Sequence, residues 1–182
     1  HSAMKHAIGP RREMRVRTLF NLLGPLTNPA GAPNQVLGVF SDQWVEPLAH
    51  VLQQLGSEHV LVVHADDGLD EISIAGPTRV AELKDGKVTV YCVEPADFGM
   101  QTADLATIAV ADAADSLRMI NAVFDGEQGP ASDIVALNAG AAIYVAGLAE
   151  SLARGVELAA ETIGSGKAKQ TLQALVEASN SV

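Results

Sequence analysis

The spacing of apolar residues predicts a strand, a helix and a second strand in the first third of the chain. Residues 34–41 (NQVLGVFS) form a short β-rich run, which is typical of a buried strand. A one-faced helix that ends at Gly56 follows, because apolar residues recur at i, i+3, i+4, i+7 and i+10: Val45, Leu48, Ala49, Leu52 and Leu55. Residues 59–64 (HVLVVH) read as a second strand. Such a βαβ unit of about 30 residues pairs its strands in parallel.

The second half of the chain changes from a strand pattern to a helical one. Residues 79–93 (RVAELKDGKVTVYCV) alternate around Asp85-Gly86, a strong short hairpin signal. Four apolar stripes at helical spacing come after it: Leu117, Ile120, Val123 and Phe124; Ile134, Leu137, Ala141, Tyr144, Val145 and Leu148; Leu152, Val156, Ala159 and Ile163; Leu172, Leu175 and Val176. The sequence therefore predicts an α/β fold, with a mostly parallel central sheet flanked by helices and an appended β-hairpin.

Composition narrows the possible functions. A hydrophobic content of 48% in 182 residues is enough for one core, and no apolar run approaches the about 20 residues that span a bilayer. The net charge of −10 argues against a nucleic-acid partner, which would need a clustered basic face. A single cysteine, Cys92, excludes an internal disulfide and a cysteine-based zinc site. We expect a cytoplasmic protein with neither a membrane nor a nucleic-acid partner.

Turn-forming residues are concentrated in residues 21–31 (NLLGPLTNPAG), inside an otherwise apolar run. Pro25 and Pro29 each fix φ at about −65° and remove a backbone donor, which excludes a continuous helix or a central strand. The leucines still favour burial. The segment is therefore either a structural crossing between two layers or a stiff wall against which a small ligand is held.

Four carboxylates follow the predicted strand 59–64: Asp66, Asp67, Asp70 and Glu71. Ligands of open α/β sheets bind at the carboxyl ends of the strands. Adjacent carboxylates repel one another unless they are protonated, solvated or bridged by a cation. Magnesium, which takes one or two carboxylates with waters and substrate phosphates, suits Asp70 and Glu71. From spacing alone, a solvated acidic loop stays an alternative, whereas the twelve-residue calcium loop pattern is absent.

Basic and nucleophilic residues give weaker signals. Arg11, shortly before the proline-rich segment, could bind a planar carboxylate bidentately, or could form a surface pair with Glu13. No arrangement of His6 or His64 with a nucleophile indicates a hydrolase triad. Residues 164–168 (GSGKA) lack the first glycine and the metal-binding hydroxyl of a phosphate loop, so we interpret them as a turn between helices.

Residues 4–31 (MKHAIGPRREMRVRTLFNLLGPLTNPAG), followed by VFS, VVH and DGLDEIS, resemble the anthranilate phosphoribosyltransferases of tryptophan biosynthesis. The resemblance extends from Met4 to the last predicted helix. It implies the C-terminal α/β domain of the nucleoside phosphorylase and phosphoribosyltransferase fold. It also implies that Arg11 contacts anthranilate, that Pro25 lines its pocket, and that Asp70 and Glu71 hold a Mg²⁺ ion bound to phosphoribosyl pyrophosphate.

The implied reaction is attack of the anthranilate amine on carbon 1 of the ribose, with departure of pyrophosphate. Because that amine is already nucleophilic, no catalytic residue or general base is assigned. In the family, a helical domain and a glycine-rich phosphate loop lie upstream of the position of His1. We therefore expect residues 1–182 to be one α/β domain, a C-terminal fragment that folds but is inactive alone, taken from an enzyme that is homodimeric when intact.

Two other classes stay open as alternatives. A pyrimidine-nucleoside-phosphorylase-like enzyme shares the architecture but should lack both Arg11 and the Asp70–Glu71 pair. A non-enzymatic nucleic-acid-binding relative would need a basic face, against which the net charge of −10 argues.

Overall fold

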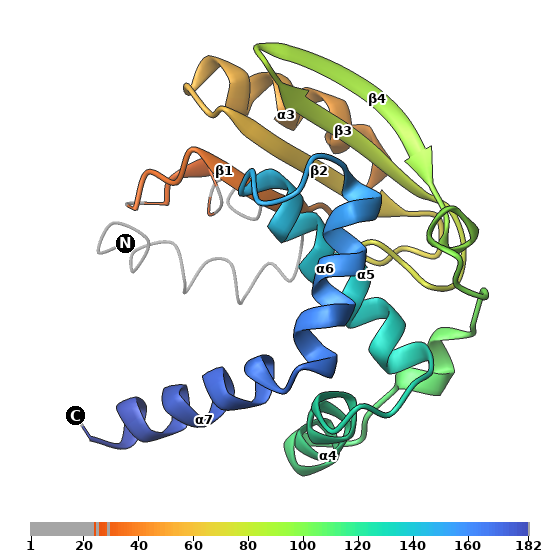
Figure 1. The fold of residues 1–182 in the computed structure, drawn as a ribbon. Helices are drawn as coiled ribbons and strands as arrows, with labels where there is room; N and C mark the ends of the chain where they lie inside the picture. Colours follow the sequence, from red (N-terminus) through yellow and green to blue (C-terminus); the bar gives the residue numbers. More distant parts are fainter. Residues whose placement is uncertain (1–23, 25, 29, 182) are drawn as a thin grey trace, which may run out of the picture. The chain divides into compact units, whose positions relative to one another are not determined.

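The computed structural model describes residues 24, 26–28 and 30–181 of the chain. It divides into two units, His1–Ala32 and Pro33–Val182. The second unit carries the sheet and the helices that position the candidate site (Figure 1). The expectation that residues 1–182 form one domain stays a prediction.

A four-stranded sheet forms the centre of the second unit, with the strands in the order β1-β2-β3-β4. Strands β1 (Asn34–Gly38) and β2 (His59–Ala65) are parallel and are connected through α3 (Val45–Gln54). The predicted βαβ unit is thereby confirmed. The two remaining strands are β3 (Thr78–Lys84) and β4 (Lys87–Val93).

The prediction of a mostly parallel sheet is wrong for these four strands. Strand β3 runs antiparallel to β2, and β4 runs antiparallel to β3. The reason lies in the connection after β2: residues 66–77 contain no helix. For β3 to pair with β2 in parallel, the chain would need a long crossover back to the end of the sheet where β2 begins. A compact loop instead starts the next strand at the end where β2 stops, so that strand runs antiparallel to β2.

The predicted hairpin is confirmed, with its turn at Asp85-Gly86. Both residues have positive φ, 50° and 70°. Two consecutive left-handed residues make the turn whose twist matches that of the flanking strands, which explains the Asp-Gly pair.

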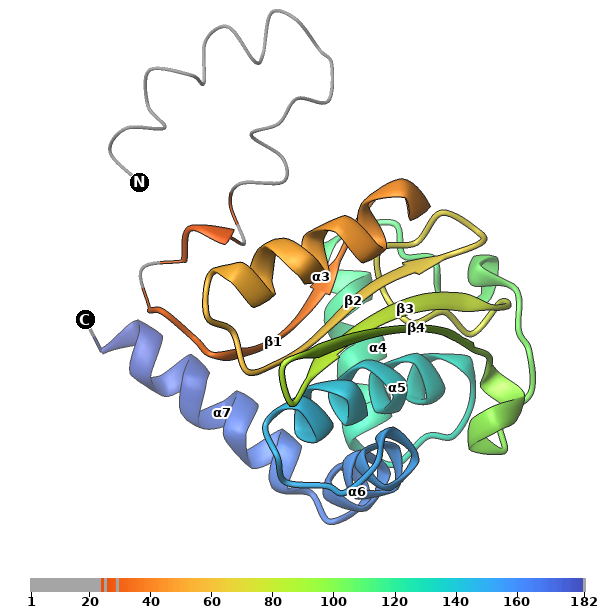
Figure 2. The same cartoon turned by 90° about the horizontal axis from the view of Figure 1, so that it is seen from above.

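Helices cover both faces of the sheet. Helix α3 lies on one face, and α5 (Pro130–Val145) and α6 (Leu152–Gly164) lie on the other (Figure 2). Helices α4 (Ala113–Phe124) and α7 (Lys167–Asn180) complete the unit. Each of the four predicted helical stripes thus falls in a helix, except that Leu148 of the second stripe lies beyond the end of α5 and is exposed. Residues 165–166 form the expected turn between α6 and α7.

The main core lies between the sheet and α5. Leu61 and Val63 of β2 are buried there together with Leu137 and Ala141 of α5. Helix α5 is thereby fixed against the parallel strands, close to the loop that leaves β2. None of the helices in the described part of the chain is long and apolar enough to cross a membrane.

Candidate functional site

The candidate cation site lies in residues 66–77, the loop that leads from the carboxyl end of β2 to β3. Asp70 and Glu71 are both exposed in this loop. The two predicted metal ligands are therefore consecutive exposed residues in the loop that follows the carboxyl end of β2, the region in which open α/β sheets bind ligands. The other two predicted site residues, Arg11 and Pro25, lie outside the described residues.

Asp67 folds the loop rather than facing a ligand. Its Oδ1 accepts a hydrogen bond of 2.9 Å from the backbone N–H of Leu69, and its Oδ2 accepts one of 2.5 Å from the hydroxyl of Ser73. The Ser73 hydroxyl in turn accepts from the N–H of Ala75 at 2.9 Å. With both Asp67 oxygens engaged inside the loop, the adjacent pair Asp70 and Glu71 stays available to a cation.

The loop backbone at Asp70 passes close to the end of β1. A Cβ added to Gly38 would lie 1.7 Å from the Asp70 carbonyl oxygen, far inside van der Waals contact. The absence of a side chain at Gly38 is therefore what lets the loop backbone lie against the end of β1. A lone glycine inside a strand pattern is a known sign of close backbone approach, so this contact had a signal in the sequence.

Helix α5 holds the loop on the other side of the carboxylate pair. The side-chain amide of Asn138 makes two hydrogen bonds of 2.9 Å to the backbone of Ile72, the residue after Glu71. Sequence reasoning missed this residue. The one feature of the sequence that could have indicated its role is that Asn138 is a polar residue of poor helix propensity in the middle of an apolar helix.

The electrostatics of the pair favour a positive partner. Although Glu71 is exposed as a residue, the partial burial of its carboxyl raises the pKa of that group, and the neighbouring charge of Asp70 raises this pKa further. Both effects penalise the ionised form, and a divalent cation beside the two carboxylates would relieve them.

The donor set fits magnesium better than a fully protein-bound metal. Among the described residues, no group of three or more His, Cys, Asp or Glu side chains could hold a metal ion. Magnesium normally keeps several waters and binds through one or two carboxylates together with substrate phosphates. Asp70 and Glu71 supply that protein share, so the residues present fit Mg²⁺.

A mostly apolar groove of about 300 Å³ adjoins the carboxylate pair. Glu71 and Leu69 form part of its wall, and α4 and α5 supply apolar residues that include Met119, Ile120 and Ile134. The Glu71 carboxylate thus lies at the rim of a concave surface, which accounts for its partial desolvation.

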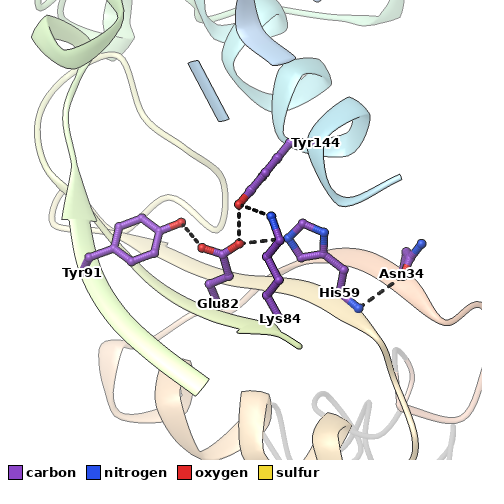
Figure 3. Close-up of polar contacts among 6 residues, drawn as sticks. All are labelled: Asn34, His59, Glu82, Lys84, Tyr91 and Tyr144. Carbon is purple, nitrogen blue, oxygen red and sulfur yellow. Dashed lines mark hydrogen bonds and ion pairs between the residues drawn. The ribbon is translucent and has the colours of Figure 1, made fainter. Parts of the chain in front are cut away.

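A second polar cluster lies away from this loop, around Glu82 on β3 (Figure 3). The Glu82 carboxylate contacts the hydroxyls of Tyr144 and Tyr91 at 2.7 and 3.0 Å, and His59 Nε2 at 2.9 Å. The ammonium of Lys84 donates to the Tyr144 hydroxyl at 3.1 Å. These polar groups satisfy one another, so the cluster joins α5 to the sheet.

The chain belongs to the glycosyl transferase family, through its a/b domain: the sequence model of that domain matches residues 1–169. An anthranilate phosphoribosyltransferase of Thioalkalivibrio sulfidiphilus is 70% identical over 176 residues, which are 97% of this chain and 52% of the relative. The chain therefore spans about half the length of the curated relatives that it matches.

Solved structures agree with this assignment. The crystal structure of anthranilate phosphoribosyltransferase from Thermus thermophilus matches with a TM-score of 0.89 and 43% identity, over 97% of this chain and 52% of that one. The Saccharomyces cerevisiae enzyme in complex with PRPP and Mg matches with a TM-score of 0.88 and 27% identity, over 100% and 53%. These likenesses confirm the α/β fold class and the family resemblance.

Proposed function

We propose that the full-length protein transfers the phosphoribosyl group of phosphoribosyl pyrophosphate (PRPP) to the amine of anthranilate. The observation that carries this proposal is the Asp70–Glu71 pair, held at the end of β2 in a chain that is 70% identical to an enzyme of that name. The products are N-(5-phosphoribosyl)anthranilate and pyrophosphate, and the reaction belongs to tryptophan biosynthesis.

Asp70 and Glu71 would hold a magnesium ion, which supplies positive charge beside the leaving pyrophosphate when it is bound. The two side chains are consecutive on a loop whose backbone lies close to Gly38 at Asp70 and is hydrogen-bonded to Asn138 at Ile72. The likeness to a relative solved with PRPP and Mg supports this role.

Arg11 and Pro25 are proposed as the anthranilate-binding residues. The planar guanidinium of Arg11 can bind a carboxylate through two parallel hydrogen bonds, and Pro25 offers a stiff apolar wall to the aromatic ring. In the reaction, the anthranilate nitrogen forms a bond to carbon 1 of the ribose while the bond to pyrophosphate breaks, and the nitrogen releases one proton to the solvent. Positioning and neutralisation of the leaving group carry most of the catalysis, because the amine needs no activation. The cytoplasmic location and the homodimeric state of the intact enzyme stay predictions.

The experiment is an assay of the full-length protein with anthranilate, PRPP and Mg²⁺, followed through the loss of anthranilate fluorescence. We expect turnover that chelation of the metal abolishes. The variant Asp70→Asn/Glu71→Gln should lose this turnover, whereas Asp85→Asn, which converts one carboxylate of the β3–β4 turn into an amide, should keep it. Failure of the wild-type protein to consume anthranilate would refute the proposal.

The role of Arg11 has its own test. Arg11→Lys keeps the charge but loses the planar fork, and a lost hydrogen bond to a charged group costs about 1.5–3 kcal/mol. The KM for anthranilate should therefore rise by roughly ten- to a hundredfold while the KM for PRPP is unchanged. An unchanged KM for anthranilate would remove Arg11 from the site.

A further inference from the structure

Asn138, inside α5, hydrogen-bonds the backbone of residues 66–77, the loop that carries Asp70 and Glu71 and is called the cation loop below. Its Oδ1 accepts a hydrogen bond from the Ile72 N–H, and its Nδ2 donates one to the Ile72 carbonyl, both at 2.9 Å. Nδ2 also donates to the Ile134 carbonyl of its own helix at 3.1 Å. A single side chain thus satisfies both backbone polar groups of one loop residue, as a neighbouring strand would.

The chemistry of this contact requires an amide. The Ile72 N–H needs an acceptor, and the Ile72 and Ile134 carbonyls need donors; asparagine supplies both within one rigid group. A carboxylate at this position would keep the acceptor but place a second oxygen against two carbonyl oxygens. An apolar residue would leave the backbone groups of Ile72, whose side chain is buried, without their protein partner.

The position of the contact links it to the carboxylates. The carbonyl of Asp70 lies against Gly38, at the end of β1, and Ile72 is bonded to Asn138. The backbone of the pair Asp70–Glu71 therefore lies between a close approach to β1 and two hydrogen bonds from α5. Since the two neighbouring charges repel one another in the absence of a cation, a loop without these supports would let them separate.

We propose that Asn138 is a positioning residue for cation binding, because it holds the backbone beside Glu71 in the geometry in which Asp70 and Glu71 act together. This inference rests on the proposed function for the identity of the cation complex, Mg²⁺ with PRPP. The ordering of the loop by Asn138 rests on geometry alone.

The experiment compares Asn138→Ala and Asn138→Asp with Val145→Ala in the full-length protein. Val145 is a buried core residue of the same helix, and its truncation removes packing without removing a hydrogen bond to the loop. The first measurement is amide hydrogen exchange of residues 66–77, without metal. We expect both Asn138 variants to speed up exchange near residues 70–73, and Val145→Ala to leave it unchanged.

The second measurement is the Mg²⁺ concentration that gives half-maximal activity. We expect both Asn138 variants to raise it about tenfold, in line with the usual effect of removing a partner that orients a metal ligand. The KM for anthranilate should stay the same. Val145→Ala should lower the melting temperature without changing the Mg²⁺ requirement.

The outcomes separate the two proposals. If neither Asn138 variant changes loop exchange, or if exchange changes but the Mg²⁺ requirement does not, Asn138 supports only the fold and this inference is overturned. If the wild-type protein does not turn over anthranilate, the proposed function fails, and the exchange data still decide whether Asn138 orders the loop. If Asn138→Ala does not fold, the same two measurements on the isosteric Asn138→Asp variant decide whether Asn138 is a positioning residue.

Discussion

The hydroxyl of Tyr144 on α5 donates a hydrogen bond of 2.7 Å to the Glu82 carboxylate on β3, and accepts one of 3.1 Å from Lys84 (Figure 3). Tyr144 thus connects a cation and an anion of the same strand through one oxygen. The side chain of Glu82 is 14% exposed and that of His59 is 12% exposed, so most of the cluster is removed from water. The helix that carries Asn138 is joined to the sheet by this contact.

Tyr144→Phe should lower the free energy of unfolding by about 1.5 kcal/mol. This is the lower end of the range for a hydrogen bond to a charged group, because Glu82 keeps Tyr91 and His59 as partners. The measurement is urea denaturation. A double-mutant cycle with Glu82→Gln should show coupling between the two positions, and purely additive losses would contradict the assigned bond.

The two tyrosines of the chain should both titrate above their ordinary range in the native protein. Burial, followed by the charge of Glu82 and its hydrogen bond, raises the pKa of Tyr91 strongly. Burial and the hydrogen bond to Glu82 also raise the pKa of Tyr144, against an opposing effect of Lys84. The ultraviolet absorbance of tyrosinate should therefore rise near pH 10 only when the chain is unfolded in urea.

The raised pKa values of the two tyrosines also determine how the free energy of unfolding changes at alkaline pH. A tyrosine whose pKa is raised in the folded state holds its proton more tightly there than in the unfolded state. Its contribution to stability is fully present below about pH 10 and is lost as the pH rises from there through the folded pKa. Tyr91→Phe should flatten this loss in melting curves recorded against pH, and an unchanged slope would contradict the buried position of the Tyr91 hydroxyl.

Gly38→Ala should disrupt the cation loop, because the new methyl group would overlap the Asp70 carbonyl oxygen. We expect a lower melting temperature and faster amide exchange in residues 66–77. The matched control is Gly76→Ala in the same loop, where an added Cβ meets no atom within 4 Å. Equal effects of the two substitutions would show that the loop, and not the contact with β1, is sensitive to side chains.

Asp70→Asn/Glu71→Gln should leave the fold intact and should melt at an equal or higher temperature than the wild type when no metal is present. The reason is that burial and the charge of Asp70 both disfavour ionised Glu71, as its raised pKa indicates. The measurement is a melting curve with and without Mg²⁺ and PRPP. A much lower melting temperature without metal would show that the pair stabilises the structure, which would contradict its role as a ligand pair.

Periodicity was sufficient to locate the elements of the second unit. The spacing from Val45 to Leu55 and the Asp85-Gly86 turn gave a helix and a hairpin in the right places, because each depends on neighbours in sequence. Strand direction depended on the path of residues 66–77, which no local pattern specifies. The sequence therefore predicts a mostly parallel sheet, although β3 runs antiparallel to both of its neighbours, β2 and β4.

In the candidate site, too, features that depend on neighbours in sequence could be predicted, whereas contacts made by tertiary packing could not. Asp70 and Glu71 are predicted as metal ligands because they follow a strand and match a family motif, and this role stays a prediction. The contact of Asn138 with Ile72 could not be predicted, because it depends on the tertiary packing that brings α5 against the loop. In the sequence Asp67 is an equal member of the acidic group, and only its two hydrogen bonds inside the loop distinguish it from the predicted ligands Asp70 and Glu71.

The contact between Asn138 and Ile72 joins positions 66 residues apart, and this separation matters during protein synthesis. A nascent chain that has left the ribosome as far as β4 already carries Asp70 and Glu71, but not the helix that orders them. Long-range contacts of this kind form late, because the intervening chain must first fold. The cation loop should therefore reach its final geometry only after α5 has been made and has packed on the sheet, which ties the appearance of the proposed metal site to completion of the domain.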